Sequence, residues 1–344
     1  MDYFVPILGL VSLFQIILSS SDYNNLHWDT LLLRSSALCN SYSGLKRKQV
    51  ALCRKFPDVA AAAMRGLELS ADECRHQMRH NRWNCSSVSA EDPRSSAIYK
   101  LGYRESALVT AIINAGMVQS VWRACRLGSV VSCGCHPHRP RRGRSWAWAG
   151  CGDEASFAVY FARSFYSAVD RSKDLRSKTI AHNGALGRKI VARNVEVRCK
   201  CHGMSGSCQM KTCWRAPPDF QVIGDRLHNR YDYAVLVESE NRRDAKLRLA
   251  FRSARRHPRA TDLVFYEKSP TFCDLDPARD SWGTQDRACN KTSFNVDNCG
   301  ALCCGRGYNT MRVKRTEKCN CRFHWCCHVK CEECVHEDWI TICK

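Results

Sequence analysis

Cysteine, glycine and serine are concentrated at positions 199–214, which hold four cysteines, two glycines and two serines. Two nested pairings of these cysteines would staple a hairpin: Cys199 with Cys213, and Cys201 with Cys208. Glycine accepts positive φ at no steric cost, so Gly203 and Gly206 are expected to turn the backbone tightly on both sides of Ser205. The pattern therefore predicts one serine hydroxyl on a rigid loop, where another enzyme can reach and modify it.

The same serine lies in a near match to the esterase pattern G-x-S-x-G. Residues 203–207 read Gly-Met-Ser-Gly-Ser, so Ser207 stands where the pattern requires glycine. The esterase serine also lies on a turn between a strand and a helix, whereas cysteines flank this one. We therefore expect no catalytic role for Ser205, and a secreted serine esterase remains the alternative function.

A second cysteine-rich stretch covers residues 319–334 and includes His324 and His328. Its Cys-x-Cys and Cys-x-x-Cys spacings suit zinc, but an oxidising secretory route favours disulfides. The pairings that would build a second hairpin are Cys319 with Cys334 and Cys321 with Cys331, with Cys326 and Cys327 bridged at the tip. A bridge between adjacent cysteines closes a small strained ring, so it requires that rigidity at the tip be useful.

Three apolar side chains would project from the tip of this second hairpin, namely Phe323, Trp325 and Val329. Aromatic side chains on a rigid, exposed tip are typical of an interface anchor. The alternative is that they fill the core of the C-terminal part, as aromatic residues more often do. We favour the interface because so narrow a unit has little core to fill.

The composition predicts an extracellular protein. The 24 cysteines are an even number, which indicates a disulfide framework in a secreted chain. An apolar run from Phe4 to Leu18, followed by three serines, predicts a signal peptide over residues 1–21. No later stretch is long and apolar enough to be expected to cross a bilayer.

The formal net charge is +20, which attracts polyanions. One dense basic run favours a sulfated glycan as partner: Arg242, Arg243, Lys246, Arg248, Arg252, Arg255, Arg256 and Arg259. An extracellular location argues against nucleic acid. The alternatives are a merely solvated face and a heparin-binding matrix protein whose basic face is its whole function.

The elements that must position these sites are expected to form an α+β fold. Apolar spacing predicts helices over residues 105–124, 155–169 and 180–195, and a helix that begins at Pro57. Whether Val235 and Leu236 belong to a strand or a helix stays open. The cysteines divide evenly around a stretch that has none, which predicts these units: an N-terminal helical domain at 22–238, a basic linker at 239–268, and a C-terminal disulfide-rich β-hairpin domain at 269–344.

Together these features resemble the Wnt family of secreted, lipid-modified signalling proteins. Besides residues 199–214, the segments that carry the resemblance are 82–86, 105–107, 133–135, 148–151, 266–270, 303–309 and 323–327. Within the family, residues 51–59 and 211–218 are most similar to the Wnt-ten branch. The resemblance covers almost the whole chain, and its motifs occur in the same order.

The resemblance implies a ligand that catalyses nothing and needs no cofactor beyond a covalent palmitoleoyl group on Ser205. A lipid-bearing hairpin (199–213) and a finger hairpin (319–334) would pinch the cysteine-rich domain of a Frizzled receptor. The receptor contacts it implies are Met204, Ser205, Gly206, Phe323, Trp325, Cys326, Cys327 and Val329. The other implied partners are a low-density-lipoprotein-receptor-related co-receptor, a membrane-bound O-acyltransferase and an export carrier; heparan sulfate proteoglycans would bind the basic run.

The resemblance also implies the remaining disulfides: Cys39–Cys53, Cys74–Cys85, Cys125–Cys133, Cys135–Cys151, Cys273–Cys304, Cys289–Cys299 and Cys303–Cys343. Two sequons in a secreted chain predict N-glycosylation at Asn84 and Asn290. Asn290 is the stronger site, because disulfide formation at Cys85 would compete with glycan transfer to its neighbour Asn84.

Overall fold

The computed structural model describes residues 39, 45–89, 91–133, 154–167, 174–241, 247–251, 257–325 and 327–344, without the side chains of residues 167, 205, 240–241 and 247–251. The expected signal peptide at 1–21 lies outside these residues. Within the described ranges, no helix combines the length and the apolar character that a membrane span requires.

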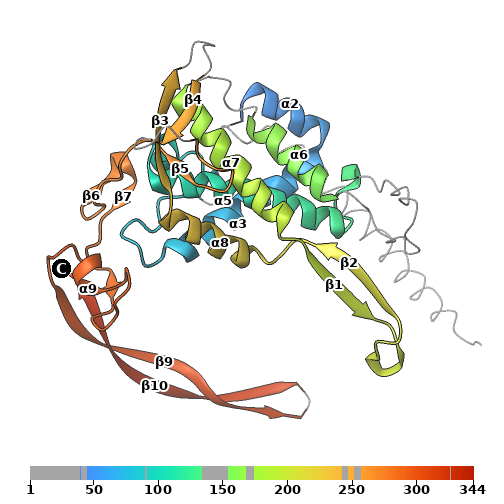
Figure 1. The fold of residues 1–344 in the computed structure, drawn as a ribbon. Helices are drawn as coiled ribbons and strands as arrows, with labels where there is room; N and C mark the ends of the chain where they lie inside the picture. The colour runs from blue at the N-terminus through green and yellow to red at the C-terminus, as the bar shows by residue number, and fades with distance from the viewer. Residues whose placement is uncertain are drawn as a thin grey trace, which may run out of the picture.

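The N-terminal part is a helical bundle built around α5 (Arg104–Arg126), which is buried along almost its whole length. The other helices of the bundle are α2 (Arg47–Lys55), α3 (Pro57–Met78), α4 (Ala97–Lys100), α6 (Glu154–Ser167), α7 (Leu175–Arg193) and α8 (Phe220–Asp232). A short 3-10 helix, η1 (Val131–Cys133), follows α5 in the sequence. A helix buried on every face needs neighbours all round, and Figure 1 shows α5 enclosed by the others.

The predicted helices are confirmed, although their ends differ. The segments 105–124, 155–169 and 180–195 correspond to α5, α6 and α7, and Pro57 is the first residue of α3. Helix α7 begins five residues earlier than predicted because Asp174 caps it, accepting a hydrogen bond from the Ser177 backbone N at 2.7 Å.

Glycine brings α3 and α5 into backbone contact. A Cβ added to Gly66 would lie 2.4 Å from the carbonyl oxygen of Gly116, and one on Gly116 would lie 2.4 Å from the carbonyl oxygen of Gly66. No side chain fits in that space. The two longest helices therefore cross at a point that both glycines are needed to form.

A three-stranded sheet begins at the end of the expected N-terminal unit and continues into the stretch expected to be a linker. Strand β3 (Val235–Asn241) pairs antiparallel with β4 (Leu247–Phe251) and parallel with β5 (Val264–Phe265), so Val235 and Leu236 lie in a strand. Asn183 of α7 holds β5 through both backbone groups of Val264, at 2.8 and 2.9 Å. The sheet is therefore fixed to the helical bundle.

The C-terminal part is rich in strands and disulfides. It consists of β6 (Leu275–Asp276), η3 (Pro277–Arg279), β7 (Ser281–Trp282), β8 (Ala288–Cys289), α9 (Cys299–Leu302), β9 (Tyr308–His324) and β10 (His328–Cys343). Its buried cluster comprises Cys299, Leu302, Cys303 and Cys343. Disulfides therefore supply the stability that so small a core cannot. The expected α+β class is confirmed.

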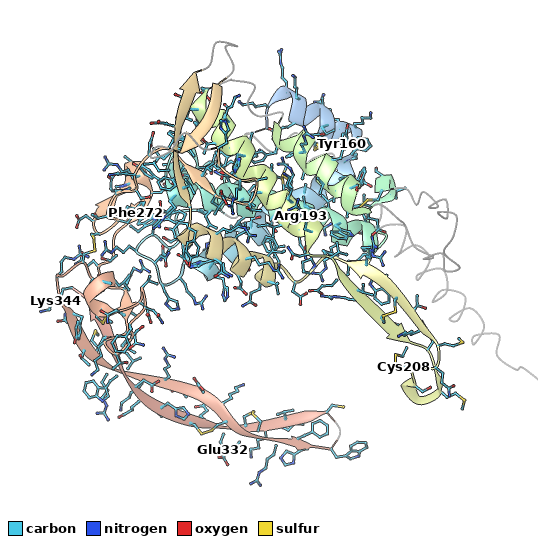
Figure 2. The ribbon with its side chains drawn as sticks, viewed as in Figure 1. Tyr160, Arg193, Cys208, Phe272, Glu332 and Lys344 are labelled. Carbon is cyan, nitrogen blue, oxygen red and sulfur yellow. A yellow bond between two sulfur atoms is a disulfide. The ribbon has the colours of Figure 1, made fainter. Side chains whose placement is uncertain are left out.

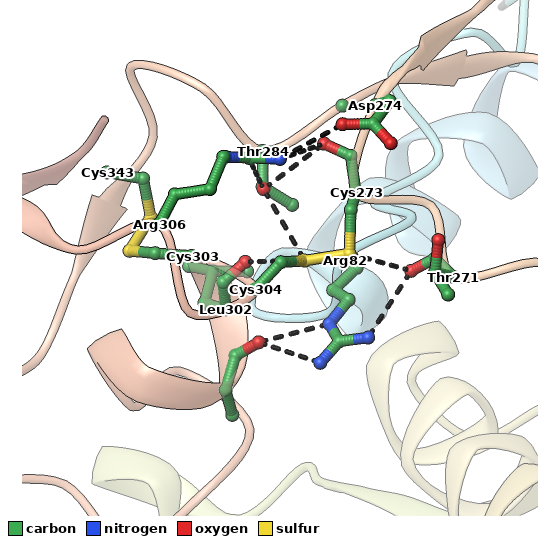
Figure 3. The surroundings of a disulfide bond; sticks show 12 residues. Arg82, Thr271, Cys273, Asp274, Thr284, Leu302, Cys303, Cys304, Arg306 and Cys343 are labelled. Atoms are coloured by element: carbon green, nitrogen blue, oxygen red, sulfur yellow. Dashed lines mark hydrogen bonds and ion pairs between the residues drawn. A yellow bond between two sulfur atoms is a disulfide. The ribbon is translucent and has the colours of Figure 1, made fainter.

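Arginine side chains fix the C-terminal part to the helical bundle. Arg82 donates from Nε and Nη2 to the carbonyl oxygen of Ala301 at 3.1 and 2.9 Å, and Arg287 donates to the carbonyl oxygen of Arg82 at 2.6 Å. Figure 3 shows Arg82 beside the Cys273–Cys304 bridge, whose other side is held by Arg306. These contacts join segments far apart in the sequence, so they set the orientation of the two parts.

Ten disulfides join described residues, and all were expected: Cys39–Cys53, Cys74–Cys85, Cys125–Cys133, Cys199–Cys213, Cys201–Cys208, Cys273–Cys304, Cys289–Cys299, Cys303–Cys343, Cys319–Cys334 and Cys321–Cys331. The pair Cys135–Cys151 lies outside the described residues. The expected Cys326–Cys327 bridge is a correction: Cys327 is an exposed free cysteine with a φ of 75°, and Cys326 is not described. The strained ring that joins adjacent cysteines gives the physical reason.

Candidate functional site: two disulfide-held hairpins

The first candidate surface is the hairpin of β1 (Glu196–Cys201) and β2 (Lys211–Ala216), called the short hairpin below. Cys199 lies directly opposite Cys213 in the antiparallel register, and the Cys201–Cys208 bridge closes the outer end. A two-stranded hairpin without a packed face is marginal in water, so the bridges hold its shape. Figure 1 shows it projecting from the bundle just after α7.

The tip of the short hairpin is a single turn of 3-10 helix, η2 (Met204–Gly206). Gly206 has a φ of 78°, as predicted, but Gly203 has a φ of −73°, so the positive φ predicted there is wrong. Glycine is needed at 203 for another reason. A Cβ there would lie 2.0 Å from Ser207 Oγ, because the Gly203 backbone N donates to the Ser207 carbonyl at 2.9 Å.

Ser205 is the middle residue of η2, and its side chain lies outside the described part of the structure. Next to it, the side chain of Met204 is 91% exposed. Below the tip, the His202 backbone N donates to the Met210 carbonyl at 2.7 Å, and its Nε2 lies 2.8 Å from Thr212 Oγ1. The tip is therefore a loop whose backbone is held by hydrogen bonds and whose apolar Met204 side chain is exposed to solvent.

The base of the short hairpin is fixed to the bundle. Buried Gln119 of α5 donates to the Pro218 carbonyl at 2.6 Å, just beyond β2. Arg198 of β1 lies 3.0 Å from Asp219 and 3.2 Å from Glu196, and the hydrogen bond with Asp219 raises the pKa of its guanidinium. These contacts set the direction in which the tip points.

The second candidate surface is the hairpin of β9 and β10, called the long hairpin below. Most side chains on both strands are exposed, and the Cys319–Cys334 and Cys321–Cys331 bridges lie in its outer half. The register shifts between Lys330 and Glu332, opposite Asn320, whose φ is 47°. Asparagine tolerates this conformation, and such a bulge increases the local twist of a hairpin.

Exposed apolar side chains surround the tip of the long hairpin. The exposed fractions are 66% for Phe323, 94% for Trp325 and 56% for Val329. These side chains do not fill the core of the C-terminal part, so that alternative is excluded. The four cysteines that suited zinc are consumed in two disulfides, and a metal needs thiolates. Figure 2, in which Cys208 and Glu332 mark the two hairpins, shows side chains pointing outward from both.

The predicted glycan sites differ in their surroundings. Asn290 is exposed, and its Oδ1 accepts hydrogen bonds from the Thr292 N and Oγ1 at 3.0 and 2.9 Å. Asn84 is half-buried beside the Cys74–Cys85 bridge. Of the basic run expected to bind sulfated glycan, Arg259 has a described side chain, and the other side chains lie outside the described part of the structure.

Comparison with known proteins agrees with this architecture. The sequence profile of the wnt family matches residues 41–344. Protein Wnt-3a of Xenopus laevis and Protein Wnt-3a of Homo sapiens are each 40% identical over 312 residues, which cover 89% of this chain and 88% and 89% of those proteins. A chain in the solved structure of human WLS in complex with WNT8A is 28% identical, with a TM-score of 0.59, and the match covers 91% of this chain and 100% of that one. The similarity to the Wnt-ten branch stays a prediction. The family itself is shown by these matches, and this chain belongs to the Wnt family.

Proposed function

We propose that the protein is a secreted ligand that grips the cysteine-rich domain of a Frizzled receptor between its two hairpins and brings it to a low-density-lipoprotein-receptor-related co-receptor. The observation that carries this proposal is the exposure of Met204 and Trp325 at the two disulfide-held tips. Large apolar side chains exposed on rigid supports are typical of binding surfaces. Members of the Wnt family are signalling ligands and not enzymes, which argues against the esterase alternative.

The proposal includes a palmitoleoyl ester on Ser205, formed by a membrane-bound O-acyltransferase. A buried methylene contributes about 0.8 kcal/mol, so a sixteen-carbon chain adds on the order of 10 kcal/mol at most. The exposed η2 turn supports access by a modifying enzyme, since its backbone is tied and its neighbour Met204 points into solvent. The lipid would then supply much of the affinity for the receptor.

A secreted ligand of this family would also need an export carrier, extracellular partners and glycosylation. The similarity to WNT8A, whose solved structure is a complex with human WLS, supports an export carrier of that kind for this chain. The basic run would hold the secreted protein in the extracellular matrix through heparan sulfate. The exposed sequon at Asn290 would carry a glycan, with Asn84 as the weaker site.

The test is the intact mass of the Ser205 peptide from secreted protein, together with the affinity of that protein for a Frizzled cysteine-rich domain. We expect a palmitoleoyl mass on the peptide, and a loss of affinity of at least about 100-fold in Ser205→Ala. Ser207→Ala is the matched control because it removes a hydroxyl two residues away in the same tip. An unmodified Ser205 in a fully potent ligand would contradict the proposal.

A further inference from the structure

A cavity of about 520 Å³ opens between α6 and α7, and no described residue of either hairpin lines it. Its apolar walls are formed by Val159 of α6 and by Ile180, Ala181 and Ala185 of α7. Figure 1 shows these two helices side by side in the bundle. Small-molecule sites in proteins are mostly apolar and enclose roughly 300–1,000 Å³, so the cavity has the size of a ligand site.

Among the described residues, the charged side chains that line the cavity are all basic. They are Arg163, Arg176, Arg188 and Lys189, and no described aspartate or glutamate lines the cavity. Arg163 and Lys189 are exposed and lie at the rim, whereas Arg188 is buried. An anion that enters would therefore meet positive charge at the mouth and at the floor.

Arg188 is a buried cation that has no counter-ion among the described residues. Its side chain is 9% exposed, and its Nη1 donates to the neutral amide oxygen of Asn114 at 2.5 Å. Across the described ranges of the chain, Arg188 forms no ion pair, and Arg176 Nε is buried without a hydrogen-bond partner. A buried charge is costly unless it is paired, and desolvation lowers the pKa of Arg188 to about 10.

Two buried tyrosines complete the polar floor. The hydroxyl groups of Tyr99 and Tyr166 are in contact, and both residues line the cavity. Burial raises the pKa of both phenols, so they stay protonated at neutral pH. A neutral phenol can donate a hydrogen bond to an oxyanion, which adds to the attraction of Arg188.

We propose that this cavity binds a single-chain fatty-acid carboxylate. The carboxylate pairs with the buried Arg188 guanidinium, which can offer two parallel donors to it. The alkyl chain lies along the apolar wall of Val159, Ile180 and Ala185. This site is separate from the ester proposed at Ser205, because no residue of the short hairpin reaches the cavity.

The test uses full-length secreted protein and three probes: decanoate, decanol and acetate. Equilibrium dialysis should show saturable binding of decanoate at one site, binding of decanol at least tenfold weaker, and no measurable binding of acetate. Equal affinity for decanol would overturn the proposal, because the charge would then contribute nothing. The Ser205→Ala protein should bind decanoate with unchanged affinity, so this test does not depend on the proposed lipid.

Variants of the protein separate the binding of the fatty-acid carboxylate from the binding of its alkyl chain. Arg188→Met should weaken decanoate binding at least tenfold, but it also removes the hydrogen bond to Asn114. Ala185→Phe leaves that bond in place and fills the cavity, so it should abolish binding in a folded, secreted protein. Arg193→Gln, on the same helix but outside the cavity, should bind like the wild type. Wild-type decanoate binding by Ala185→Phe would overturn the assignment of this cavity.

Discussion

The short hairpin and the long hairpin each have two disulfides near the tip, but different contacts hold their bases. The short hairpin has strands of six residues, and Gln119 and Arg198 tie its base directly to the bundle. The long hairpin has strands of 17 and 16 residues and rises from a small cluster of cysteines. The short hairpin is therefore supported by the helical core, whereas the long hairpin depends on disulfides at its base and in its outer half.

The largest expected effect tests this dependence at the base of the long hairpin. Cys303 and Cys343 are buried and close a sequence separation of 40 residues. Replacing both with serine should lower the free energy of unfolding by about 4 kcal/mol from chain entropy alone. The Cys199–Cys213 bridge spans 14 residues, so the same change there should cost about 3 kcal/mol. Denaturant unfolding of the two double variants gives the comparison.

An equal or larger loss of unfolding free energy in the Cys199 and Cys213 double variant would contradict the expected difference between the two hairpins. That result would mean that the contacts of the short hairpin with α5 and Asp219 contribute less than the geometry indicates. The half-buried Cys319–Cys334 pair in the outer half of the long hairpin serves as a control. Because it is far from the base, its removal should loosen the tip without unfolding the C-terminal cluster.

The next effect concerns what the tips bind and not what holds them. Trp325→Ala should reduce affinity for the receptor domain by about 2 kcal/mol, or about 30-fold, since exposed aromatic anchors are frequent hot spots. The unfolding transition should not move, because the indole is almost fully exposed. Trp339→Ala is the control: its indole is also exposed on β10, but it lies near the base. Equal losses in binding would show that the tip is not the anchor.

Sequence alone predicted the elements whose signals are local. Helix α5 followed from its apolar spacing, and α8 could have been found in the same way, because Phe220, Ile223 and Leu227 recur at helical spacing after Pro218 and bury one face. The pairing of the cysteines outside the two hairpins was available only through the family resemblance, since spacing alone permits many connectivities. Local periodicity and family motifs together therefore accounted for most of the fold.

What sequence could not predict depends on tertiary contacts. The requirement for glycine at 203 arises from the close approach of Ser207, which exists only once the tip is closed. The bulge at Asn320 depends on how two strands pair, and no residue pattern marked it. Arg82 belonged to a recognised motif, but its partner Ala301 is more than two hundred positions away. The positions of both hairpins relative to the bundle depend on such contacts.

A smaller effect is expected at the junction that orients the long hairpin. Arg82→Met removes both hydrogen bonds to the Ala301 carbonyl while keeping the aliphatic stem. The loss should be about 1 kcal/mol, because the guanidinium is exposed and water can replace it. Hydrogen exchange should rise in α9 and not in the short hairpin. Arg279→Met, which removes a local ion pair with Asp276, is the matched control, and a uniform rise in exchange would contradict a local junction.

The smallest effect separates the bundle from both hairpins by its pH dependence. Burial lowers the pKa of His182 in α7, whose Nε2 lies 2.9 Å from the Asp262 carbonyl before β5. As pH falls below about 6.5, the unfolded chain takes up this proton more readily than the folded protein, so stability decreases with falling pH. His182→Gln should reduce the loss of unfolding free energy between pH 7 and pH 5, by less than about 1 kcal/mol. The same replacement at the exposed His80 is the control and should leave that loss as it is in the wild type. After correction for the intrinsic exchange rate at each pH, protection against hydrogen exchange should therefore fall at β5 and α7 between pH 7 and 5 and change less in the disulfide-held hairpins. A loss of protection confined to the hairpins would place the acid-sensitive contact there and contradict the assignment.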